Sequence, residues 1–322
     1  MDYKKTGLIF HRSKPCSDDL ISRTVLTLLC GLLLLSLFLN PSPLFGKDRS
    51  TLRVYTVNYP LAYFAERIGG KYVEVVMPVP PDEDPAYWKP GIDDIVAFQQ
   101  ADLILLNGAS YAKWVPTATL PQSKMVGTSR SFRDRYIRIE GVLAHSHGAE
   151  GEHAHEGIAF TTWLDLSLAA QHAKAIADAL VRKMPEQRKL FERNAAKLEE
   201  ELEALDREIG EIVSRNQDQP LVGSHPVYQY FARRYGLNMR EVHWEPDEAP
   251  DRHQWVELED MLKAHPAEWM IWEGEPMEET VERLQVIGVG SFVFNPCGNV
   301  TDEGDFMSVM GQNVTNLSAA FK

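Results

Sequence analysis

Most of the sequence consists of two stretches in which strand-like and helix-like patterns alternate. A long amphipathic helix separates the two stretches. The first stretch predicts strands over residues 52–57, 72–79 and 101–106 and helices over residues 61–68 and 91–100. The strand segments are apolar at most positions, which indicates that both faces of their sheet are covered. Strands of this kind that alternate with helices are typical of a parallel sheet in an α/β lobe.

The middle of the chain predicts two consecutive helices, over residues 166–183 and from Pro185 to about Val213. Pro185 suits the first turn of a helix, where a backbone N–H has no partner within the helix. Along the second helix, apolar residues recur at spacings of 4, 3, 4 and 3: Leu198, Leu202, Leu205, Ile209 and Ile212. This spacing places one apolar stripe along a rod of roughly 40 Å. We interpret the charged opposite face as solvated and the helix as a rigid strut.

The alternation of strands and helices resumes after the long helix. Strands are predicted over residues 221–224, 240–244, 269–272 and 292–294, and a last helix runs from about Phe306 to Ala320. The expected fold class is α/β, with two Rossmann-like lobes that contain parallel sheets and are joined by a long rigid α-helix. The expected boundaries are residues 51–183 for the N-terminal lobe, 184–216 for the linker helix and 217–322 for the C-terminal lobe.

The first 46 residues have the pattern of an export signal. A lead with five Lys and Arg residues is followed by a mostly apolar run of 15 residues from Val25 to Leu39 and by the small residue Gly46. The run is shorter than the about 20 residues of a membrane-spanning helix. We expect a signal peptide over residues 1–46 and an exported, periplasmic protein, with an uncleaved anchor as the alternative. The mature chain then has one cysteine, Cys297, and no internal disulfide.

The formal net charge of −13 over 322 residues bears on the kind of partner. A protein that binds nucleic acid needs a surplus of Lys and Arg on one face, and the sequence has no such basic stripe. An acidic surface suits solubility and attracts cations. We therefore expect no nucleic-acid partner.

Polar residues that directly follow the predicted strands are candidates for ligand binding, because ligands of open α/β sheets lie beyond the carboxyl ends of the strands. Such positions are held by His225, Glu273, Glu275 and Asn295 in the second stretch and by Asp82, Glu83 and Asp84 in the first. An imidazole at a strand end, followed by Pro226 and an amphipathic helix, is expected to face a cleft between the lobes. The alternative is that His225 only caps that helix.

Residues 144–158 contain three glycines and four histidines but no hydrophobic period, so we interpret them as a mobile surface loop. The histidines form two His-x-His pairs, His145 with His147 and His153 with His155. Neutral imidazoles bind zinc, copper and nickel, and both donors of a pair can reach one ion. The loop is therefore a candidate for attracting metal, with accidental clustering of histidines in a linker as the alternative.

The most distinctive segment is residues 223–237, Gly-Ser-His-Pro-Val-Tyr-Gln-Tyr-Phe-Ala-Arg-Arg-Tyr-Gly-Leu. Supporting segments are residues 84–90, Trp163-Leu164-Asp165 and Ile271-Trp272-Glu273, together with the His-rich acidic loop before Trp163. With these segments, residues 51–322 resemble the zinc and manganese solute-binding proteins of ABC importers. The resemblance implies two α/β lobes joined by a long helix, with one metal ion held between the lobes.

The resemblance also implies four metal ligands, of which this chain keeps one. His225 matches the histidine of the second lobe, whereas Ala86, Thr161 and Asn295 stand where two further histidines and an aspartate are expected. Alanine has no donor atom, threonine is a poor zinc ligand, and an asparagine oxygen carries no charge. One imidazole cannot supply the three or four protein donors that zinc requires.

Three interpretations of the cleft stay open. In the first, other groups complete the metal site: Asp84, Glu273 or a histidine of the 145–155 loop that folds inward. In the second, metal is bound weakly and mostly by the loop, and the protein is a metal buffer or a docking subunit. In the third, the cleft binds a different ligand against an aromatic lining formed by Tyr87, Trp88, His243 and Trp244.

The expected function is capture of a divalent transition metal, zinc by default and otherwise manganese, and its delivery to the permease of an ABC importer. We expect no catalytic cofactor, and contact with a membrane only through the importer or an uncleaved signal. An enzyme is not expected, because the sequence has no His-Glu-x-x-His or Gly-x-Ser-x-Gly motif. An adhesin-like interaction protein on the same scaffold is a further alternative.

Overall fold

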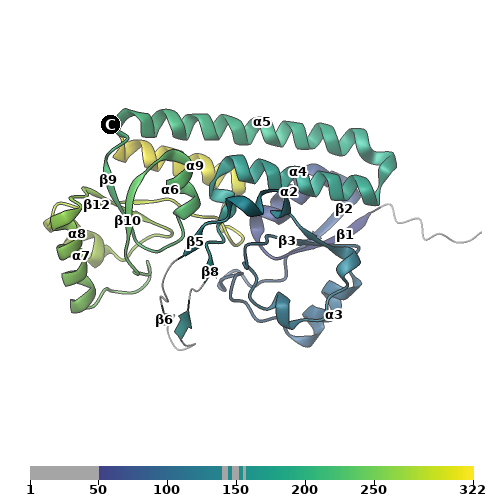
Figure 1. The fold of residues 1–322 in the computed structure, drawn as a ribbon, viewed down its shortest axis with the longest axis horizontal. Helices are drawn as coiled ribbons and strands as arrows, with labels where there is room; N and C mark the ends of the chain where they lie inside the picture. Colours follow the sequence, from purple (N-terminus) through teal and green to yellow (C-terminus); the bar gives the residue numbers. More distant parts are fainter. Residues whose placement is uncertain (1–50, 140–143, 147–151, 155–156) are drawn as a thin grey trace, which may run out of the picture. The chain divides into compact units, whose positions relative to one another are not determined.

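The computed structural model describes residues 51–139, 144–146, 152–154 and 157–322 (Figure 1). By its internal contacts the chain divides into Met1–Arg49 and Ser50–Lys322, and the described residues all belong to the second of these units. The predicted signal peptide, residues 1–46, lies outside the described residues. Within the described ranges, no helix combines the length and the apolar character that crossing a membrane requires.

The first sheet has four parallel strands in the order β2-β1-β3-β4. Its strands are β1 (Leu52–Thr56), β2 (Val73–Val76), β3 (Leu103–Leu106) and β4 (Met125–Gly127), and its helices are α2 (Tyr59–Gly69) and α3 (Ile92–Gln100). The two central strands, β1 and β3, are mostly buried, as their apolar composition predicts. Helix α2 begins at Asn58, whose side chain accepts a hydrogen bond from the N–H of Leu61.

The second sheet also has four parallel strands, in the order β10-β9-β11-β12. Its strands are β9 (Pro220–Gly223), β10 (Asn238–Glu241), β11 (Trp269–Trp272) and β12 (Gly290–Val293). Its helices are α6 (Gln229–Tyr235), α7 (Arg252–Ala264), α8 (Glu278–Val286) and α9 (Phe306–Ala320). Helices α7 and α9 begin at Asp251 and Asp305, whose carboxylates accept hydrogen bonds from backbone N–H groups of the first turn.

Helices α4 (Leu166–Lys183) and α5 (Arg188–Val213) connect the two sheets. Figure 1 shows α5 running past both sheets, packed on α4 and α2 at one end and on α9 and α6 at the other. With 26 residues, α5 is about 40 Å long. Four residues of its predicted stripe are buried: Leu198, Leu202, Ile209 and Ile212. They belong to one hydrophobic core that also contains Val54 of β1 and Leu221 of β9, so the two lobes share a core.

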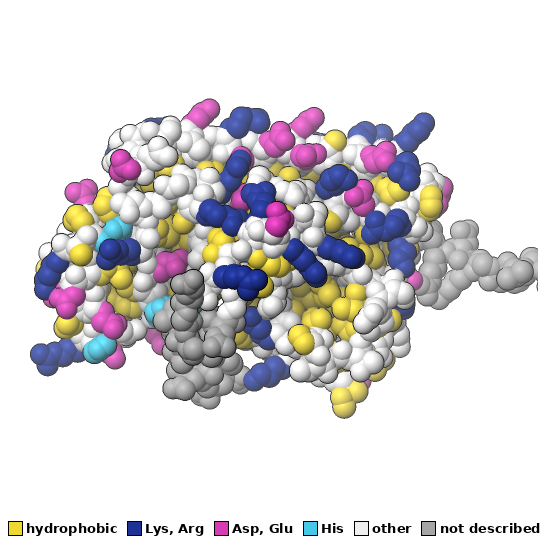
Figure 2. Space-filling model, in the orientation of Figure 1, with side chains coloured by type: hydrophobic (Ala, Val, Ile, Leu, Met, Phe, Trp, Pro, Cys, Tyr) yellow, Lys and Arg dark blue, Asp and Glu magenta, His cyan; other side chains and the backbone are white. Residues whose placement is uncertain are grey.

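The outer face of α5 is charged and exposed, as its sequence pattern predicts. Glu199, Glu200, Glu203 and Arg207 are exposed there, and Figure 2 shows acidic and basic side chains interspersed along this edge of the molecule. Several ion pairs on this face join residues one helical turn apart, such as Glu203 with Arg207. Exposed pairs of this kind contribute little to stability, so the helix is held mainly by its apolar stripe.

The predicted fold class is confirmed: both sheets are parallel, and a long helix spans them. Helices α4 and α9 and strand β11 have the bounds expected from the sequence. Strand β4 was not predicted, because its three residues Met125–Gly127 are too short to show a pattern. Short 3₁₀ turns also occur at Gly70–Tyr72, Val115–Thr117, Gln122–Lys124, Arg130–Arg135, Thr162–Leu164, Pro185–Gln187 and Ser214–Asn216.

Two short antiparallel pairs interrupt the first lobe, and three of their four strands lie within residues 144–158, the segment predicted as a mobile surface loop. Strand β5 (Arg138–Ile139) pairs with β8 (Gly157–Ile158), and β6 (Ala144–Ser146) pairs with β7 (Glu152–Ala154). The pairing places His145 opposite His153 in the backbone register. Such ladders form through backbone hydrogen bonds, so they can occur in a segment that has no hydrophobic period.

Candidate metal centre

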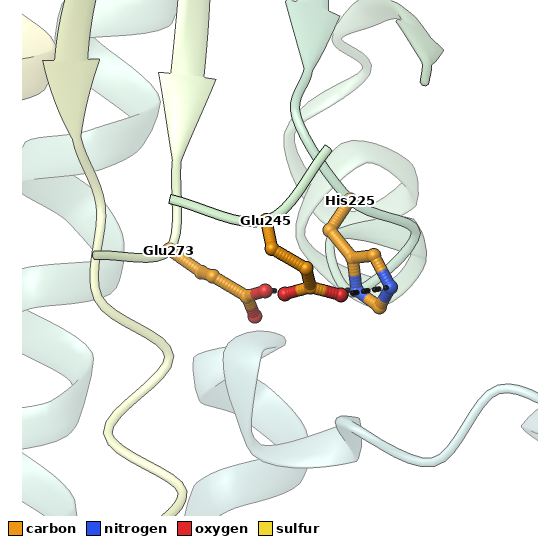
Figure 3. A group of neighbouring side chains, drawn as sticks. All are labelled: His225, Glu245 and Glu273. Atoms are coloured by element: carbon orange, nitrogen blue, oxygen red, sulfur yellow. Dashed lines mark ion pairs between the residues drawn. The ribbon is translucent and has the colours of Figure 1, made fainter. Parts of the chain in front are cut away.

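Three side chains converge at the carboxyl ends of neighbouring strands in the second sheet. His225 follows β9, Glu245 follows β10 and Glu273 follows β11, and β9 lies between the other two strands. One donor atom from each side chain lies within 4.8 Å of the other two. The His225 Nε2 atom is 3.4 Å from Glu245 Oε1, and its Nδ1 atom is 3.6 Å from Glu273 Oε1. Figure 3 shows the three side chains pointing toward one another.

Backbone hydrogen bonds that continue beyond the strands hold this group in place. The Ser224 N–H donates to Ile271 O at 2.9 Å, and the Trp244 N–H donates to Ser224 O at 2.7 Å. The segment before Glu245 is therefore fixed beside the segment before His225. Gly223 permits the close approach of β9 and β10 at this end of the sheet, because a Cβ atom at that position would lie 3.2 Å from Glu241 Cγ.

The three side chains are largely shielded from water. The exposed side-chain fractions are 10% for His225, 24% for Glu245 and 23% for Glu273. Burial raises the pKa of the neighbouring Tyr228 well above its ordinary value, and the negative charges of Glu273 and Glu241 raise it further. The phenol therefore stays protonated, and it donates a hydrogen bond to Phe294 O at 2.9 Å. The site is a shielded region of negative charge, which favours a cation.

A cavity of about 280 Å³ lies against these side chains, and residues of the first lobe form its other wall. Asp84, Tyr87 and Phe160 belong to that wall. Asn299, which follows β12, holds the loop that carries Asp84, because its side-chain amide donates to Pro80 O and Glu83 O at 2.7 and 2.8 Å. Residues of both lobes thus line one cavity.

The structure brings together some of the predicted site residues and separates others. His225 and Glu273 lie in the group of three, and Asp84 lines the same cavity without belonging to that group. His145 and His153 lie on β6 and β7, where only the backbone is described, and His147 and His155 lie outside the described residues.

The three residues that replace expected ligands have other partners. Ala86 is fully buried. The Thr161 hydroxyl donates to Val227 O at 2.5 Å. The Asn295 Oδ1 atom accepts a hydrogen bond from the N–H of Cys297 at 2.7 Å. Of the three, only Thr161 lines the cavity.

Glu245 is the site residue that the sequence prediction missed. The rule that polar residues follow strands applies to it as well, because a strand is predicted over residues 240–244. In the structure β10 ends at Glu241, and Val242 and Trp244 continue the pairing through hydrogen bonds to Gly223 and Ser224. The signal is therefore present in the sequence, in the residue directly after Trp244.

The predicted aromatic lining is present only in part. Tyr87 lines the cavity together with Phe160, which was not predicted. Trp88 packs against Trp114 with 6.1 Å between ring centroids, and Trp244 is buried in the core of the second lobe. The His243 ring lies 6.2 Å from the His225 ring, outside the described lining of the cavity.

One imidazole and two carboxylates form a donor set for a divalent cation. Four donors placed tetrahedrally at about 2.1 Å from zinc lie about 3.4 Å apart, and one donor atom from each of the three side chains lies within 4.8 Å of the other two. Glu245 and Glu273 face different ring nitrogens. Whichever nitrogen binds the ion, the other can donate its proton to a carboxylate, which orients the ring and makes it a better ligand.

Behind the site, Glu241 gives a testable dependence of stability on pH. Burial raises its pKa from an ordinary 4.5 to about 7, and hydrogen bonds from the Tyr228 backbone and from Gln229 oppose this rise. Because the folded-state pKa is the higher one, the ionised carboxylate destabilises the fold above pH 7, and this cost disappears as the pH falls toward 4.5. We expect Glu241→Gln to stabilise the protein at pH 8 by up to about 3 kcal/mol relative to its effect at pH 5.

Urea denaturation of both proteins at the two pH values measures this difference. Glu268→Gln is the matched control, because Glu268 is exposed in the same lobe. An effect of Glu241→Gln that is equal at pH 5 and pH 8 would contradict the assignment.

The chain has two parallel sheets that a long helix spans, and a shielded group of donors lies beside a cavity lined from both lobes. Together these features define a two-lobed solute-binding protein. Residues 54–320 match the family model described as "ZnuA: Zinc-uptake complex component A periplasmic". The chain belongs to this family, whose members are substrate-binding components of transporters and not enzymes.

Several known proteins are similar to the chain. It is 28% identical over 278 residues to the zinc-binding lipoprotein AdcA of Streptococcus pneumoniae serotype 4, and the matched region covers 83% of this chain and 55% of AdcA. It is 30% identical over 204 residues to the manganese ABC transporter substrate-binding lipoprotein PsaA of S. pneumoniae, and the matched region covers 60% of this chain and 62% of PsaA. The chain thus spans about half the length of AdcA.

The fold is also similar to that of a solved structure. The metal-dependent lipoprotein YcdH of Bacillus subtilis superposes with a TM-score of 0.72 at 23% sequence identity, which covers 84% of this chain and 99% of YcdH. The relatives include both zinc-binding and manganese proteins. Family membership therefore indicates a divalent metal as the ligand and leaves the choice between zinc and manganese open.

Proposed function

We propose that this chain is an exported, periplasmic solute-binding protein that captures a divalent transition metal, zinc by default, and delivers it to the permease of an ABC importer. The observation that supports this most is the convergence of His225, Glu245 and Glu273 at three adjacent strand ends beside a cavity that Asp84 also lines. The donors that the family pattern lacks at Ala86, Thr161 and Asn295 are thus replaced by carboxylates.

Capture in this protein needs binding and no chemistry. The second lobe supplies His225, Glu245 and Glu273, and the first lobe presents Asp84 across the cavity. Because α5 packs on both lobes and they share a core, we expect small changes of the lobes during binding and release. The carboxylates attract the ion, and their oxygen atoms suit manganese as well as zinc.

The test is calorimetric titration with zinc and manganese of the full chain and of a variant that lacks residues 144–157. We expect about one tight equivalent of metal in both, with an affinity that changes less than about threefold when the His-rich segment is removed, because the described donors lie outside it. If the tight equivalent disappears with the segment, the loop and not the cavity is the binding site. No binding by the full chain would contradict the proposal as a whole.

A further inference from the structure

A hydrogen bond joins the two lobes within the lining of the cavity. The Thr161 hydroxyl donates to Val227 O at 2.5 Å, and both residues line the cavity. Thr161 belongs to the first lobe and is 5% exposed, so the bond is shielded from water, which would otherwise compete for the carbonyl. Val227 follows His225 by two residues, and its N–H donates to His225 O at 2.8 Å. The bond between the lobes therefore acts on the turn that carries His225.

A buried histidine supports the segment that carries Thr161. His172 of α4 is fully buried, with its Nδ1 atom 2.6 Å from Thr128 Oγ1 and its Nε2 atom 2.8 Å from Thr162 Oγ1. The Thr128 hydroxyl donates its one proton to Leu106 O at 3.0 Å, so it accepts its second bond from an Nδ1–H group. The Nε2 atom is then an acceptor, and the Thr162 hydroxyl donates to it. These bonds assign one neutral tautomer to His172 and fix Thr162, the neighbour of Thr161.

The ring of His172 stays neutral because of its surroundings. Burial lowers its pKa from an ordinary 6.5 to about 3, since a positive charge on the ring would lose its hydration. The ring also packs edge to face on Phe132, with 5.1 Å between the ring centroids. The acceptor that holds Thr162 is therefore present at neutral pH.

The same network holds the other side of the segment. Asn107, which follows β3, donates through Nδ2 to Phe160 O at 2.9 Å, and its Oδ1 atom accepts a hydrogen bond from Asn58 Nδ2 at 3.4 Å. Asn58 and Asn107 are buried, and they follow β1 and β3 as Thr128 follows β4. Side chains from three strand ends thus converge behind residues 160–162. Buried hydrogen-bonded networks of this kind make the segments that they hold rigid.

We propose that Thr161 is a positioning residue of the metal centre: it holds the turn that carries His225 against the first lobe, and His172 keeps Thr161 in place through Thr162. Both atoms of the Thr161–Val227 bond belong to the protein, and neither is one of the donors described above, so the bond does not depend on an ion. It raises the fraction of the chain that is ready to bind, and the apparent affinity rises with that fraction. The role in affinity rests on the proposed function.

Hydrogen exchange of the metal-free chain, followed by mass spectrometry, tests the contact itself. Thr161→Val keeps the shape of the side chain and removes the hydroxyl, and we expect exchange to rise about fivefold in residues 225–232, as loss of one buried hydrogen bond implies. Thr161→Ser keeps the hydroxyl and should restore exchange to within about twofold of the unaltered chain. Thr117→Val is the matched control, because the Thr117 hydroxyl donates to Trp114 O at 2.8 Å within the first lobe. Equal exchange in Thr161→Val and the unaltered chain would overturn the inference.

Calorimetric titration with zinc then connects the contact to the metal centre. Thr161→Val should weaken zinc binding about fivefold, and Thr161→Ser and Thr117→Val less than about twofold. If Thr161→Val exchanges faster but binds zinc as tightly as the unaltered chain, Thr161 has only a structural role and the inference is overturned. Absence of zinc binding by the unaltered chain would overturn the proposed function together with the role in affinity, whereas the exchange result would still show whether Thr161 joins the lobes.

A double-mutant cycle tests the role of His172. Thr162→Val removes the hydroxyl that donates to His172 Nε2 and keeps the shape of the side chain. If the network acts through Thr161, Thr162→Val should weaken zinc binding about threefold in the unaltered chain and cause no further loss in Thr161→Val. Losses that add in the double variant would show that His172 acts independently of Thr161, and they would overturn this part of the inference.

Discussion

Replacing Glu245 with glutamine should weaken zinc binding at least about 100-fold, a loss of about 2.7 kcal/mol. Glutamine keeps the size of the side chain but removes one of the two negative charges that face His225. An amide oxygen is a weaker ligand for a divalent ion than a carboxylate, and loss of only an outer hydrogen-bond partner already costs 10- to 100-fold in metal affinity. Calorimetric titration with zinc at constant pH measures the change.

Glu248→Gln is the matched control, because Glu248 is exposed three residues further along the same segment and its replacement removes the same charge from the protein. It should change zinc affinity less than about twofold, since exposed charges are screened. His225→Ala should lower the affinity at least as much as Glu245→Gln. If the Glu245→Gln and Glu248→Gln variants bind zinc equally well, Glu245 is not a ligand, and another side chain must supply that donor.

Much of the fold could be predicted because its elements are long or strongly apolar. The apolar segment Trp269–Trp272 is a central strand, and the periodic segment Phe306–Ala320 is a helix with the expected bounds. The stripe on α5 is buried at four of its five positions, and the fifth, Leu205, is partly buried. Hydrophobic periodicity is the strongest local signal, and these segments carry it over enough residues to be read.

The elements that escaped prediction are those held by backbone pairing. Strand β4 and the pairs β5-β8 and β6-β7 have two or three residues in each strand. Such segments bury too few side chains to leave a pattern, and their position depends on which strand they meet. That information is distributed over the chain and is absent from the segment itself.

The site is predictable to the extent that it follows from strand ends. His225 and Glu273 directly follow apolar strands, and this position in the sequence is enough to predict that both lie at the carboxyl edge of a sheet. Their convergence with Glu245 depends on the strand order β10-β9-β11, in which the first strand of the lobe lies between the next two. Strand order is set by packing between distant segments, so the group of three could not be assembled from local sequence.

A second group of charges joins the lobes on the side of α4. Asp165, with a side chain that is 1% exposed, caps the N-terminus of α4 by accepting hydrogen bonds from the N–H groups of Ser167 and Leu168. Its carboxylate also lies 3.0 Å from Arg135 Nη2, 4.0 Å from Arg233 Nη2 and 3.8 Å from Arg234 Nε. The two last arginines belong to α6 of the second lobe.

The Trp163-Leu164-Asp165 segment of the sequence therefore has a structural role. The Trp163 Nε1–H group donates to Pro296 O at 2.7 Å, which connects it to the segment after β12. The Asp165 carboxylate lies among three arginines and reduces the repulsion between them. Arg234 has a further partner in Asp206 of α5, with 2.9 Å between Arg234 Nε and Asp206 Oδ1. The group thus ties α4, α5 and α6 together.

Asp165→Ala should lower the free energy of unfolding by about 2 kcal/mol, because it removes a helix cap and the buried carboxylate that lies among three partly exposed arginines. Asp165→Asn keeps an acceptor for the cap and should lose about 1 kcal/mol less. Asp178→Asn on the same helix is the control, because its side chain is 55% exposed and pairs only with the exposed Lys174 in the described ion pairs. It should change stability by less than about 0.5 kcal/mol. Guanidinium denaturation measures all three, and an Asp165→Asn variant as stable as the unaltered chain would show that the cap alone, and not the charge, makes Asp165 important for joining the lobes.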